Sequence, residues 1–544
     1  MTGAERWREQ GLLCRNAALP YNAGSMRMCV STRYWVPGVL CAAAMFAGAG
    51  GTAWAQSADY AFVPPTVKSA GEADLVRFPL PQAEARRLLA LPMPERAYSS
   101  FAGQTDALKA KAAAGPALEV AAGQQIDLDA AVLFGEPLLE DGKCRWLARV
   151  ASRGALALRL RADLSGFAPG QSLYLIGADG GRTFGPFTCA QARDWGTWLP
   201  TVLGESVILL LESPDATLPP VRIEALSHFY RLFDDAPVKD ALPCPEPADC
   251  EPAQAAREVS TAVAMLIVPQ GTGQVQCSGT LLNRAGTPTY DPLMVTAHHC
   301  FSGIGLHVED VEAFWDYRTG SCDTTAKAPP FNTLLRSKGS EMLAVSKRLD
   351  GQFLRLDHVP VGQYGRAWAG WDARTPVVGD QVQGFHLPAG TTMKTNYGTV
   401  TGVEQTECVD LLCSNRYEMQ TIVRWDEGIT EGGSSGSGMF YRNLNWRLGG
   451  MLSNGTIHTC GKPENNRDDF ASFREFYPLI ACHLSEGAVC VPREKSGCLL
   501  SRLFGAKSAV TEALRGFRDQ GLGATPWGRA LSRAYYKVSP PLAR

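Results

Sequence analysis

Short apolar runs separated by turn residues dominate the middle of the chain, and they predict strands rather than helices. Residues 155–160 alternate between apolar and polar side chains, as a strand with one buried face does. The runs at 172–176, 207–211 and 221–226 have the length of strands, and a glycine-rich turn follows the first of them. Short strands at this spacing predict a β-sandwich over residues 126–233.

The same strand-and-turn pattern returns over residues 244–482 and predicts a second β unit. Between the two units, residues 234–243 combine prolines with charged residues, which indicates a linker. Residues 56–125 are rich in alanine, proline and charge. We interpret them as an irregular leader or pro-segment with one helical stretch near residues 82–91. The fold class we predict is therefore all-β.

The last part of the chain, residues 483–544, is predicted to be a short helical tail. Helical patterns recur at 508–519 and at 527–536. The tail contains no apolar run long enough to span a membrane, so we expect no C-terminal anchor.

Size and charge limit the possible partners. The chain has 544 residues, enough for two to four domains, and 45% of them are hydrophobic against 19% charged. The formal net charge is −2 and no long run carries one sign, which gives no support for binding nucleic acid or an anionic membrane. We expect a monomer that binds no nucleic acid.

The N-terminus has the pattern of an export signal over residues 1–55. Arg27 and Arg33 precede an apolar run at 39–46, and a small-x-small cleavage pattern ends at Ala55. The apolar run is too short for a membrane span, which needs about 20 residues. We therefore predict a periplasmic or extracellular protein that is cleaved after Ala55.

The cysteines fit an oxidising compartment. The chain has sixteen, three of which precede Ala55, so thirteen remain after the predicted cleavage. Their irregular spacing lacks paired C-x-x-C clusters, so we expect no metal site, and no motif calls for a cofactor. Cys144 and Cys189 could cross-link the predicted sandwich.

Two segments of the second unit carry the candidate chemistry. Residues 296–300 place His299 beside a cysteine at the end of an apolar strand, and residues 430–438 place Ser435 inside a glycine-rich turn. Serine is a poor nucleophile at neutral pH and needs an adjacent base that a third group orients. A tight glycine turn can also aim two backbone N–H groups, those of Gly433 and Ser435, at one point and so form an oxyanion hole.

Asp350 is the best candidate for the orienting carboxylate. It stands at the start of an apolar strand, 51 residues after His299 and 85 residues before Ser435. An acid at the mouth of such a strand can be buried and aimed at a histidine. The sequence therefore predicts a catalytic set of His299, Asp350 and Ser435.

Short motifs in the second unit resemble known proteases. The sequences C-S-G-T-L, T-A-H-H-C and G-S-S-G-S resemble the chymotrypsin-like serine proteases and stand at 277–281, 296–300 and 433–437. Three further segments resemble the bacterial lysyl endopeptidase family in particular: 315–322, 368–372 and 428–437. The resemblance covers about residues 240–482 and implies two six-stranded β-barrels with the active site between them.

The resemblance also implies roles for single residues. His299 would be the general base, Asp350 its orienting partner and Ser435 the nucleophile, with the N–H groups of Gly433 and Ser435 as the oxyanion hole. It implies three disulfides: Cys244–Cys460, Cys250–Cys322 and Cys277–Cys300. Proximity in sequence adds two further candidate pairs and leaves Cys498 over: Cys408–Cys413 and Cys482–Cys490.

The specificity pocket departs from the trypsin pattern. A trypsin-type pocket would carry an aspartate six residues before the serine, where this chain has Ile429. The lysyl endopeptidase family instead uses an aspartate on a later strand, and Asp468 matches it best, with Asp469 as the alternative. Such a carboxylate would bind the basic side chain of lysine or arginine. We interpret His386 as structural and His458 as a surface or internally satisfied histidine.

Activation is also expected to differ from trypsin. In many trypsin-like zymogens a new N-terminus pairs with an aspartate just before the serine, but Ser434 stands at that position. We therefore predict that activity needs no buried N-terminal ammonium. The resemblance implies self-processing after a lysine, and Lys239 in the predicted linker is the candidate.

The sequence thus predicts a secreted serine endopeptidase that acts on proteins or peptides and cuts after basic residues, with lysine as the first candidate and arginine as the second. The alternative is a surface binding or adhesion protein on a protease scaffold. We interpret the sandwich as an accessory domain or pro-domain, with Trp195 and Trp198 as the stacking residues if it binds carbohydrate. The C-terminal tail resembles a bacterial motif called the CFI-box.

Overall fold

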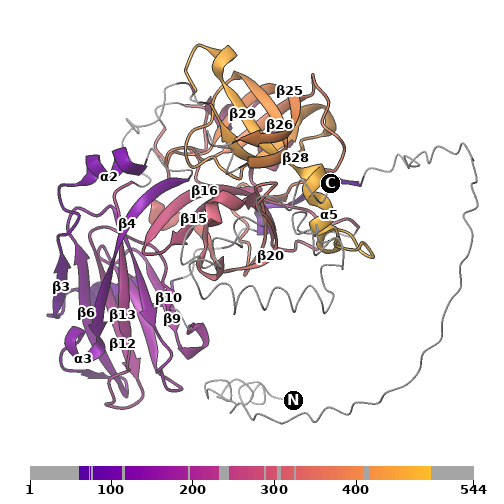
Figure 1. Cartoon of the computed structure of the whole chain (residues 1–544). Coiled ribbons are helices and arrows are strands. Elements are labelled where there is room, and N and C mark those ends of the chain that lie inside the picture. The colour runs from indigo at the N-terminus through magenta and orange to yellow at the C-terminus, as the bar shows by residue number, and fades with distance from the viewer. Residues whose placement is uncertain are drawn as a thin grey trace, which may run out of the picture.

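The computed structural model describes residues 61–491 (Figure 1), apart from 73, 75–77, 113–116, 194–195, 232–243, 245, 287–288, 303–307, 324–325, 409–415 and 457. The predicted signal region, linker and CFI-like tail lie outside the described residues. So do Lys239, Cys413, Cys498 and Trp195. Within the described part of the chain, none of the helices has the length and apolar composition of a membrane span.

The N-terminal unit is a sandwich of two layers, drawn in purple in Figure 1, whose strands pair antiparallel except for β3 and β6. One layer has the strand order β3-β6-β12-β8-β9, with β5 added to β6: Glu95–Tyr98, Lys143–Ser152, Ser206–Ser213, Ser172–Gly177, Thr183–Phe187 and Leu138–Glu140. The other has the order β10-β7-β13-β4, with β11 added to β7: Thr197–Trp198, Ala157–Asp163, Arg222–Phe229, Leu118–Asp129 and Val202–Leu203. Apolar side chains from both layers form one core between them.

Helix α1 (Gln82–Leu89) explains why β12 has an uninterrupted apolar run. Ile208 and Leu210 pack with Leu88 of α1 on the outer face of the sheet. Leu209 belongs to the core between the two sheets. Because both faces of β12 are covered, alternation with polar residues is lost. Helices α2 and α3 span Thr105–Ala112 and Ala130–Leu133.

The second unit contains a half-barrel followed by a closed barrel. In the first, the strand order β19-β18-β15-β16-β17-β21-β20 forms a half-barrel: Leu335–Lys338, Glu312–Trp315, Val263–Gln270, Gly273–Leu281, Leu293–Ala297, Gly351–Leu356 and Ser340–Ser346. Its two end strands, β19 and β20, are consecutive and meet at Gly339, whose φ is 96°. A left-handed φ of this kind favours glycine, and it allows the sharp turn.

The second barrel is closed by six strands, in the order β24-β25-β26-β29-β28-β27 and back to β24. They span Gln381–His386, Lys394–Cys408, Arg416–Glu427, Arg467–Ser472, Arg447–Gly455 and Gly438–Tyr441. Helix α5 (Phe473–Leu484) follows β29, and its Phe476 and Ile480 pack into the large core of the half-barrel. The predicted chymotrypsin-like fold class is therefore confirmed. Of the two six-stranded barrels that the resemblance implies, the second is closed by six strands, whereas the first is a half-barrel of seven described strands. Helix α4 spans Gln254–Ser260.

The expectation of an irregular leader is wrong for its first described residues. Strand β1 (Phe62–Val63) pairs with β23 (Trp371–Asp372), and β2 (Thr66–Lys68) pairs with β22 (Arg366–Trp368). β14 (Glu246–Pro247) adds to β25 in the same way. Strands of two or three residues are held by backbone bonds to an existing edge, so they leave no hydrophobic period in the sequence.

The sandwich and the half-barrel share one sheet. Strand β4 pairs with β13 of the sandwich along most of its length, and its first residues pair with β16 of the half-barrel. The seam is also polar and buried: the Arg159 guanidinium donates to the side-chain oxygen of Gln274 at 2.9 Å and lies 3.5 Å from Glu312. The predicted boundary at residue 126 therefore falls inside β4.

The predicted staple between Cys144 and Cys189 is wrong. Cys144 is a buried free thiol on β6 that faces the core between the sheets, and Cys189 is in a disulfide without it. Cys189 begins a 3₁₀ turn after β9, and sequence alone does not show whether two such cysteines face each other. Trp198 is fully buried, as a core residue would be.

Candidate active site

Strands β17 and β21 bring His299 and Asp350 together. The two strands are antiparallel neighbours, and Ala297 at the end of β17 lies opposite Gly351 at the start of β21. His299 follows β17 in a short 3₁₀ turn, and Asp350 precedes β21. The sequence separation of 51 residues is thus closed by one strand pairing.

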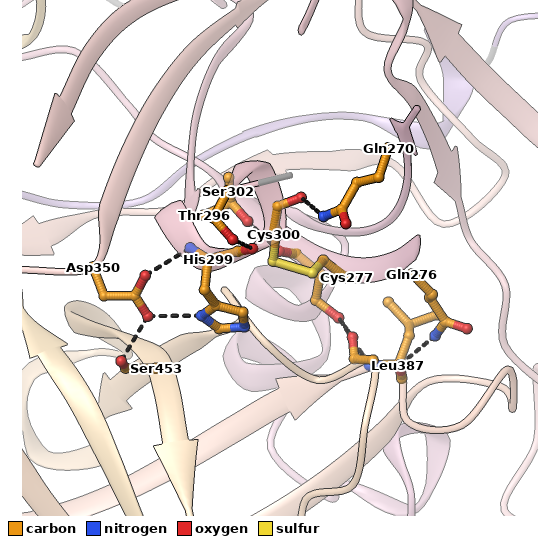
Figure 2. The surroundings of a disulfide bond; sticks show 12 residues. Gln270, Gln276, Cys277, Thr296, His299, Cys300, Ser302, Asp350, Leu387 and Ser453 are labelled. Atoms are coloured by element: carbon orange, nitrogen blue, oxygen red, sulfur yellow. Dashed lines mark hydrogen bonds and ion pairs between the residues drawn. A yellow bond between two sulfur atoms is a disulfide. The ribbon is translucent and has the colours of Figure 1, made fainter. Parts of the chain in front are cut away.

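Asp350 is a fully buried acceptor of three hydrogen bonds (Figure 2). One carboxylate oxygen accepts from the backbone N–H of His299 at 2.7 Å. The other lies 2.7 Å from Nδ1 of the His299 ring and accepts from the Ser453 hydroxyl at 2.6 Å. A carboxylate facing Nδ1 selects the tautomer whose Nε2 carries a lone pair, which is the form that can act as a base.

The environment of His299 is also fixed from the other side. The Cys277–Cys300 disulfide ties β16 to the residue after His299, as Figure 2 shows. The amide of Gln270 donates to the Cys300 carbonyl at 3.0 Å. Nε2 of His299 is buried without a hydrogen-bond partner in the described part of the chain. The ring is therefore oriented by its neighbours and keeps one nitrogen for a reacting group.

The glycine-rich turn places Ser435 against the same strands. The backbone N–H of Ser278, the residue after Cys277, donates to the Ser435 carbonyl at 2.8 Å. Gly436 has a φ of 84°, and a Cβ there would lie 2.2 Å from the Thr296 hydroxyl oxygen and 2.7 Å from the Ala297 nitrogen. Only glycine tolerates both the positive φ and this close approach. The turn therefore packs directly against Thr296 and Ala297, which precede His299 by three and two residues.

The N–H groups expected to form an oxyanion hole are not used by the turn itself. Neither Gly433 nor Ser435 donates its backbone N–H to a backbone carbonyl among the described residues. Gly433 has a φ of 95°, and its own carbonyl accepts from the Ser278 hydroxyl at 3.0 Å. The turn is thus held through its carbonyls, while these two N–H groups stay available to a ligand.

A buried neutral pair supports the residue before Ser435. The Ser434 hydroxyl lies 2.8 Å from Nδ1 of His386 and accepts from the backbone N–H of Glu431 at 3.3 Å. Burial lowers the pKa of His386 to about 3, with smaller contributions from the positive charges of Lys394 and His458. His386 is therefore neutral at physiological pH. It serves as the structural histidine that the sequence indicates.

Asp468 lies on β29, within hydrogen-bonding distance of the segment that leads into the Ser435 turn. It stands on β29 opposite Gly455 of β28, where an added Cβ would be 2.0 Å from the Asp468 carboxylate. The carboxylate also accepts from the Thr430 hydroxyl at 2.6 Å, and Thr430 is five residues before Ser435. Asp469 points elsewhere, because Arg467 donates to it at 2.9 Å. Of the two candidates, Asp468 is the one beside the serine turn.

Two further groups complete the surroundings of Asp468. The indole N–H of Trp425 donates to it at 2.5 Å, and Nε2 of His458 lies 3.0 Å from its other oxygen. Burial by itself lowers the pKa of His458, but the hydrogen bond and the charge of Asp468 outweigh burial and raise the pKa to about 9. His458 is therefore internally satisfied, which is one of the two interpretations from the sequence. With this raised pKa it is also a buried cation at neutral pH.

The structure contains each disulfide that the resemblance implies, namely Cys244–Cys460, Cys250–Cys322 and Cys277–Cys300. It also contains Cys482–Cys490, which was expected from proximity alone. The pair Cys408–Cys413 lies outside what the structure describes. The first of these bonds spans 216 residues and joins the start of the second unit to the segment after β28.

Comparison with known proteins agrees with this geometry. Residues 238–472 match the family model described as the lysyl endopeptidase C-terminal domain. The chain is therefore a serine protease, and its residues 238–472 are similar to the lysyl endopeptidase C-terminal domain. A lysyl endopeptidase from Pseudomonas aeruginosa is 26% identical over 364 residues, which cover 63% of this chain and 75% of that protein.

Solved structures similar to this serine protease are more distant. The Rv3671c protease from Mycobacterium tuberculosis in its active form has a TM-score of 0.31 and 14% identity, and the match covers 47% of this chain and 94% of that one. The MamO protease domain from Magnetospirillum magneticum has a TM-score of 0.28 and 14% identity, over 42% of this chain and 97% of that one.

Sequence reasoning missed two residues of this protease site. Ser453 lies on β28 and donates to Asp350, which is 103 residues earlier in the chain. His458 lies in the loop after β28 and contacts Asp468. Neither lies in a motif with Asp350 or Asp468. The only sequence signal for His458 is its place between Gly455 and Cys460, close to the strand that carries Ser453.

Proposed function

We propose that the chain is an exported serine endopeptidase that cleaves peptide bonds after lysine or arginine. His299 acts as the base that takes the proton from the Ser435 hydroxyl, and Asp350 orients it. Ser435 attacks the scissile carbonyl and forms an acyl-enzyme, while the N–H groups of Gly433 and Ser435 bind the oxyanion. Water activated by His299 then releases the acid product.

One observation carries the proposal: the Asp350 carboxylate faces Nδ1 of His299 from a fully buried position. An ion isolated from water in this way is costly unless it has partners, and its partners here are a ring N–H, a backbone N–H and the Ser453 hydroxyl. Such an arrangement has a chemical use only if the remaining nitrogen of the ring, Nε2, accepts a proton. Ser435 is the hydroxyl whose turn is seated against the same strand.

The test is a digest of a peptide library by the purified, exported form. Cleavage after lysine or arginine, and loss of cleavage in a Ser435→Ala variant, would support both the catalytic set and an acidic pocket. A folded protein that cleaves neither a peptide nor a lysyl p-nitroanilide would instead favour the binding or adhesion protein on a protease scaffold. The cysteine pattern and the signal-like N-terminus support export, and an N-terminus at Gln56 in the precursor would test it.

We expect the charge preference to depend on Asp468 and not on Asp469. Asp468→Asn should lower kcat/KM for lysyl and arginyl substrates by roughly a hundredfold relative to a substrate with a neutral side chain, because a buried carboxylate that pairs with the substrate cation is lost. Asp469→Asn is the matched control on the same strand, and its effect should stay within about tenfold. Equal losses in the two variants would contradict the assignment. Circular dichroism should verify that both are folded.

The sandwich supports a further part of the proposal, that the chain is made as a zymogen. A substrate side chain that reaches Asp468 lies on the β28 and β29 side of Ser435, so the residues after the scissile bond must leave on the β16 side. There the edge of β16 is already paired with β4, and Leu118 lies opposite Gln276, next to Cys277. A Cβ on Gly432 would lie 3.4 Å from Leu118. Strand β4 thus occupies the space that the substrate residues after the scissile bond would need.

This occupancy predicts a selective block in the unprocessed chain. With Lys239→Gln to keep the chain intact, a lysyl p-nitroanilide should be hydrolysed far more readily than a peptide that continues beyond the scissile bond. Leu118→Glu should raise cleavage of the peptide roughly tenfold, because burying a charge between β4 and Gly432 loosens the strand. The control is Leu139→Glu on the exposed surface of the sandwich. An equal block of both substrates that Leu118→Glu does not relieve would contradict the prediction.

A further inference from the structure

The carboxylate proposed to recognise the substrate already has a cationic partner within the chain. The ring of His458 lies with Nε2 3.0 Å from Asp468 and with Nδ1 2.7 Å from the carbonyl oxygen of Thr430. His458 is 8% exposed and Asp468 is 1% exposed. An imidazolium donates from both nitrogens, and both nitrogens here face acceptors. The backbone N–H of Thr430 also lies 3.2 Å from Nδ1, but the contact with the carbonyl oxygen is the shorter of the two and favours an imidazolium that donates from both nitrogens.

We propose that His458 is a second specificity-determining residue, whose imidazolium offsets the charge of Asp468 and competes with the basic side chain of the substrate for that carboxylate. The inference rests on the proposed function, because it assumes that Asp468 is the group that reads a basic side chain. It adds that, in the enzyme without substrate, the Asp468 carboxylate is already paired with the His458 imidazolium.

The remaining charges near the pair do not alter this balance. Arg467 directs its side chain to Asp469 at 2.9 Å and to Glu404 at 3.3 Å, and offers only its backbone carbonyl to His458, at 3.3 Å. His386 contributes a neutral ring, since burial lowers its pKa to about 3. The groups that meet Asp468 beside His458 are the hydroxyl of Thr430 and the indole of Trp425, and both are neutral donors.

The pair also uses most of the capacity of the carboxylate. Three donors already reach the two oxygens of Asp468, which together offer about four lone-pair sites. A substrate ammonium or guanidinium therefore either takes the place of the His458 ring or binds to a carboxylate whose charge is largely cancelled. Both alternatives weaken binding while His458 is charged.

The consequence is a dependence of KM on pH that the catalytic histidine does not explain. Asp468 raises the pKa of His458 to about 9, so the imidazolium persists through neutral pH and is lost as the pH rises through that value. The lysyl ammonium keeps its own proton to about pH 10.4. Between these values the carboxylate changes partner, and KM for lysyl substrates should fall.

The experiment measures KM and kcat for a lysyl p-nitroanilide, which does not extend beyond the scissile bond as a peptide does, from pH 7 to pH 10 in the exported protein and in a His458→Asn variant. We expect KM of the wild type to fall by about tenfold over this range. The variant should show the low KM already at pH 7, with a flat profile. His358→Asn, an exposed histidine on the half-barrel, is the matched control and should follow the wild type. A neutral isostere of arginine, citrulline, should show no such fall in KM with either enzyme.

A second readout separates recognition from a structural role. In the inactive Ser435→Ala protein, NMR of labelled histidine should show both ring N–H protons of His458 at pH 7, and adding N-acetyl-lysine should shift or remove them. A wild-type enzyme that cleaves after basic residues, with a KM profile that His458→Asn leaves unchanged, would overturn this inference and leave the proposed function standing. A wild-type enzyme that cleaves nothing would overturn both.

Discussion

Replacing Ser435 with alanine should abolish peptidase activity, with kcat falling on the order of 10⁵- to 10⁶-fold. The hydroxyl is the only part removed, because the turn is held by the Ser435 carbonyl, which accepts from the Ser278 N–H, and by the close packing of Gly436. The fold and the binding of substrate should therefore survive. The measurement is kcat on a lysyl peptide, together with Kd for the same peptide by calorimetry.

The matched control is Ser437→Ala, which removes a buried hydroxyl two residues later in the same segment. Its kcat should remain within about tenfold of the wild type, since that hydroxyl has no part in the proposed chemistry. If Ser435→Ala retained kcat within an order of magnitude of the wild type, Ser435 would not be the nucleophile. If both variants lost all activity and all peptide binding, the result would indicate damage to the turn itself.

Asp350→Asn should cost about 10⁴-fold in kcat with little change in KM. An asparagine offers one acceptor oxygen where the carboxylate accepts three hydrogen bonds, and its NH₂ group would face Nδ1 of His299. The ring would then take the tautomer with the proton on Nε2, which cannot accept a proton from serine. NMR of the imidazole nitrogens should show this change of tautomer directly.

The Ser453 hydroxyl provides the comparison for Asp350. Ser453→Ala removes one of the three donors to the carboxylate but leaves its charge and its contact with Nδ1, so we expect a loss of roughly tenfold. The order of effects is the informative result. An Asp350→Asn variant no worse than Ser453→Ala would mean that another acid orients His299.

Much of the catalytic site could be predicted from the sequence because its members sit at strand ends. His299 and Asp350 flank two apolar runs that pair as β17 and β21, so knowing that both are strands nearly fixes their meeting. The glycines around Ser435 likewise report a turn that requires positive φ. These signals are local, and a local reading of the chain recovers them.

What could not be predicted depends on contacts between distant segments. Ser453 is one serine among many until β28 is placed beside Asp350. The pairing of β4 with β16 joins residues more than 150 positions apart, through backbone groups that every residue carries. The ionisation of His458 depends on burial together with Asp468, and neither is visible in the loop that contains the histidine.

The short strands at the N-terminus change what a single cut in the chain would achieve. Strands β1 and β2 belong to the first described residues, yet they are held by β23 and β22 of the protease domain, and β4 adds a third seam along β16. Cutting the polypeptide within residues 232–243 would remove one covalent bond and none of these pairings. The two fragments would remain a single particle on a sizing column. If the chain is processed there, as we propose, release of the protease domain would require a second event, such as digestion of the sandwich, and until that event β4 would still obstruct peptides that continue beyond the scissile bond.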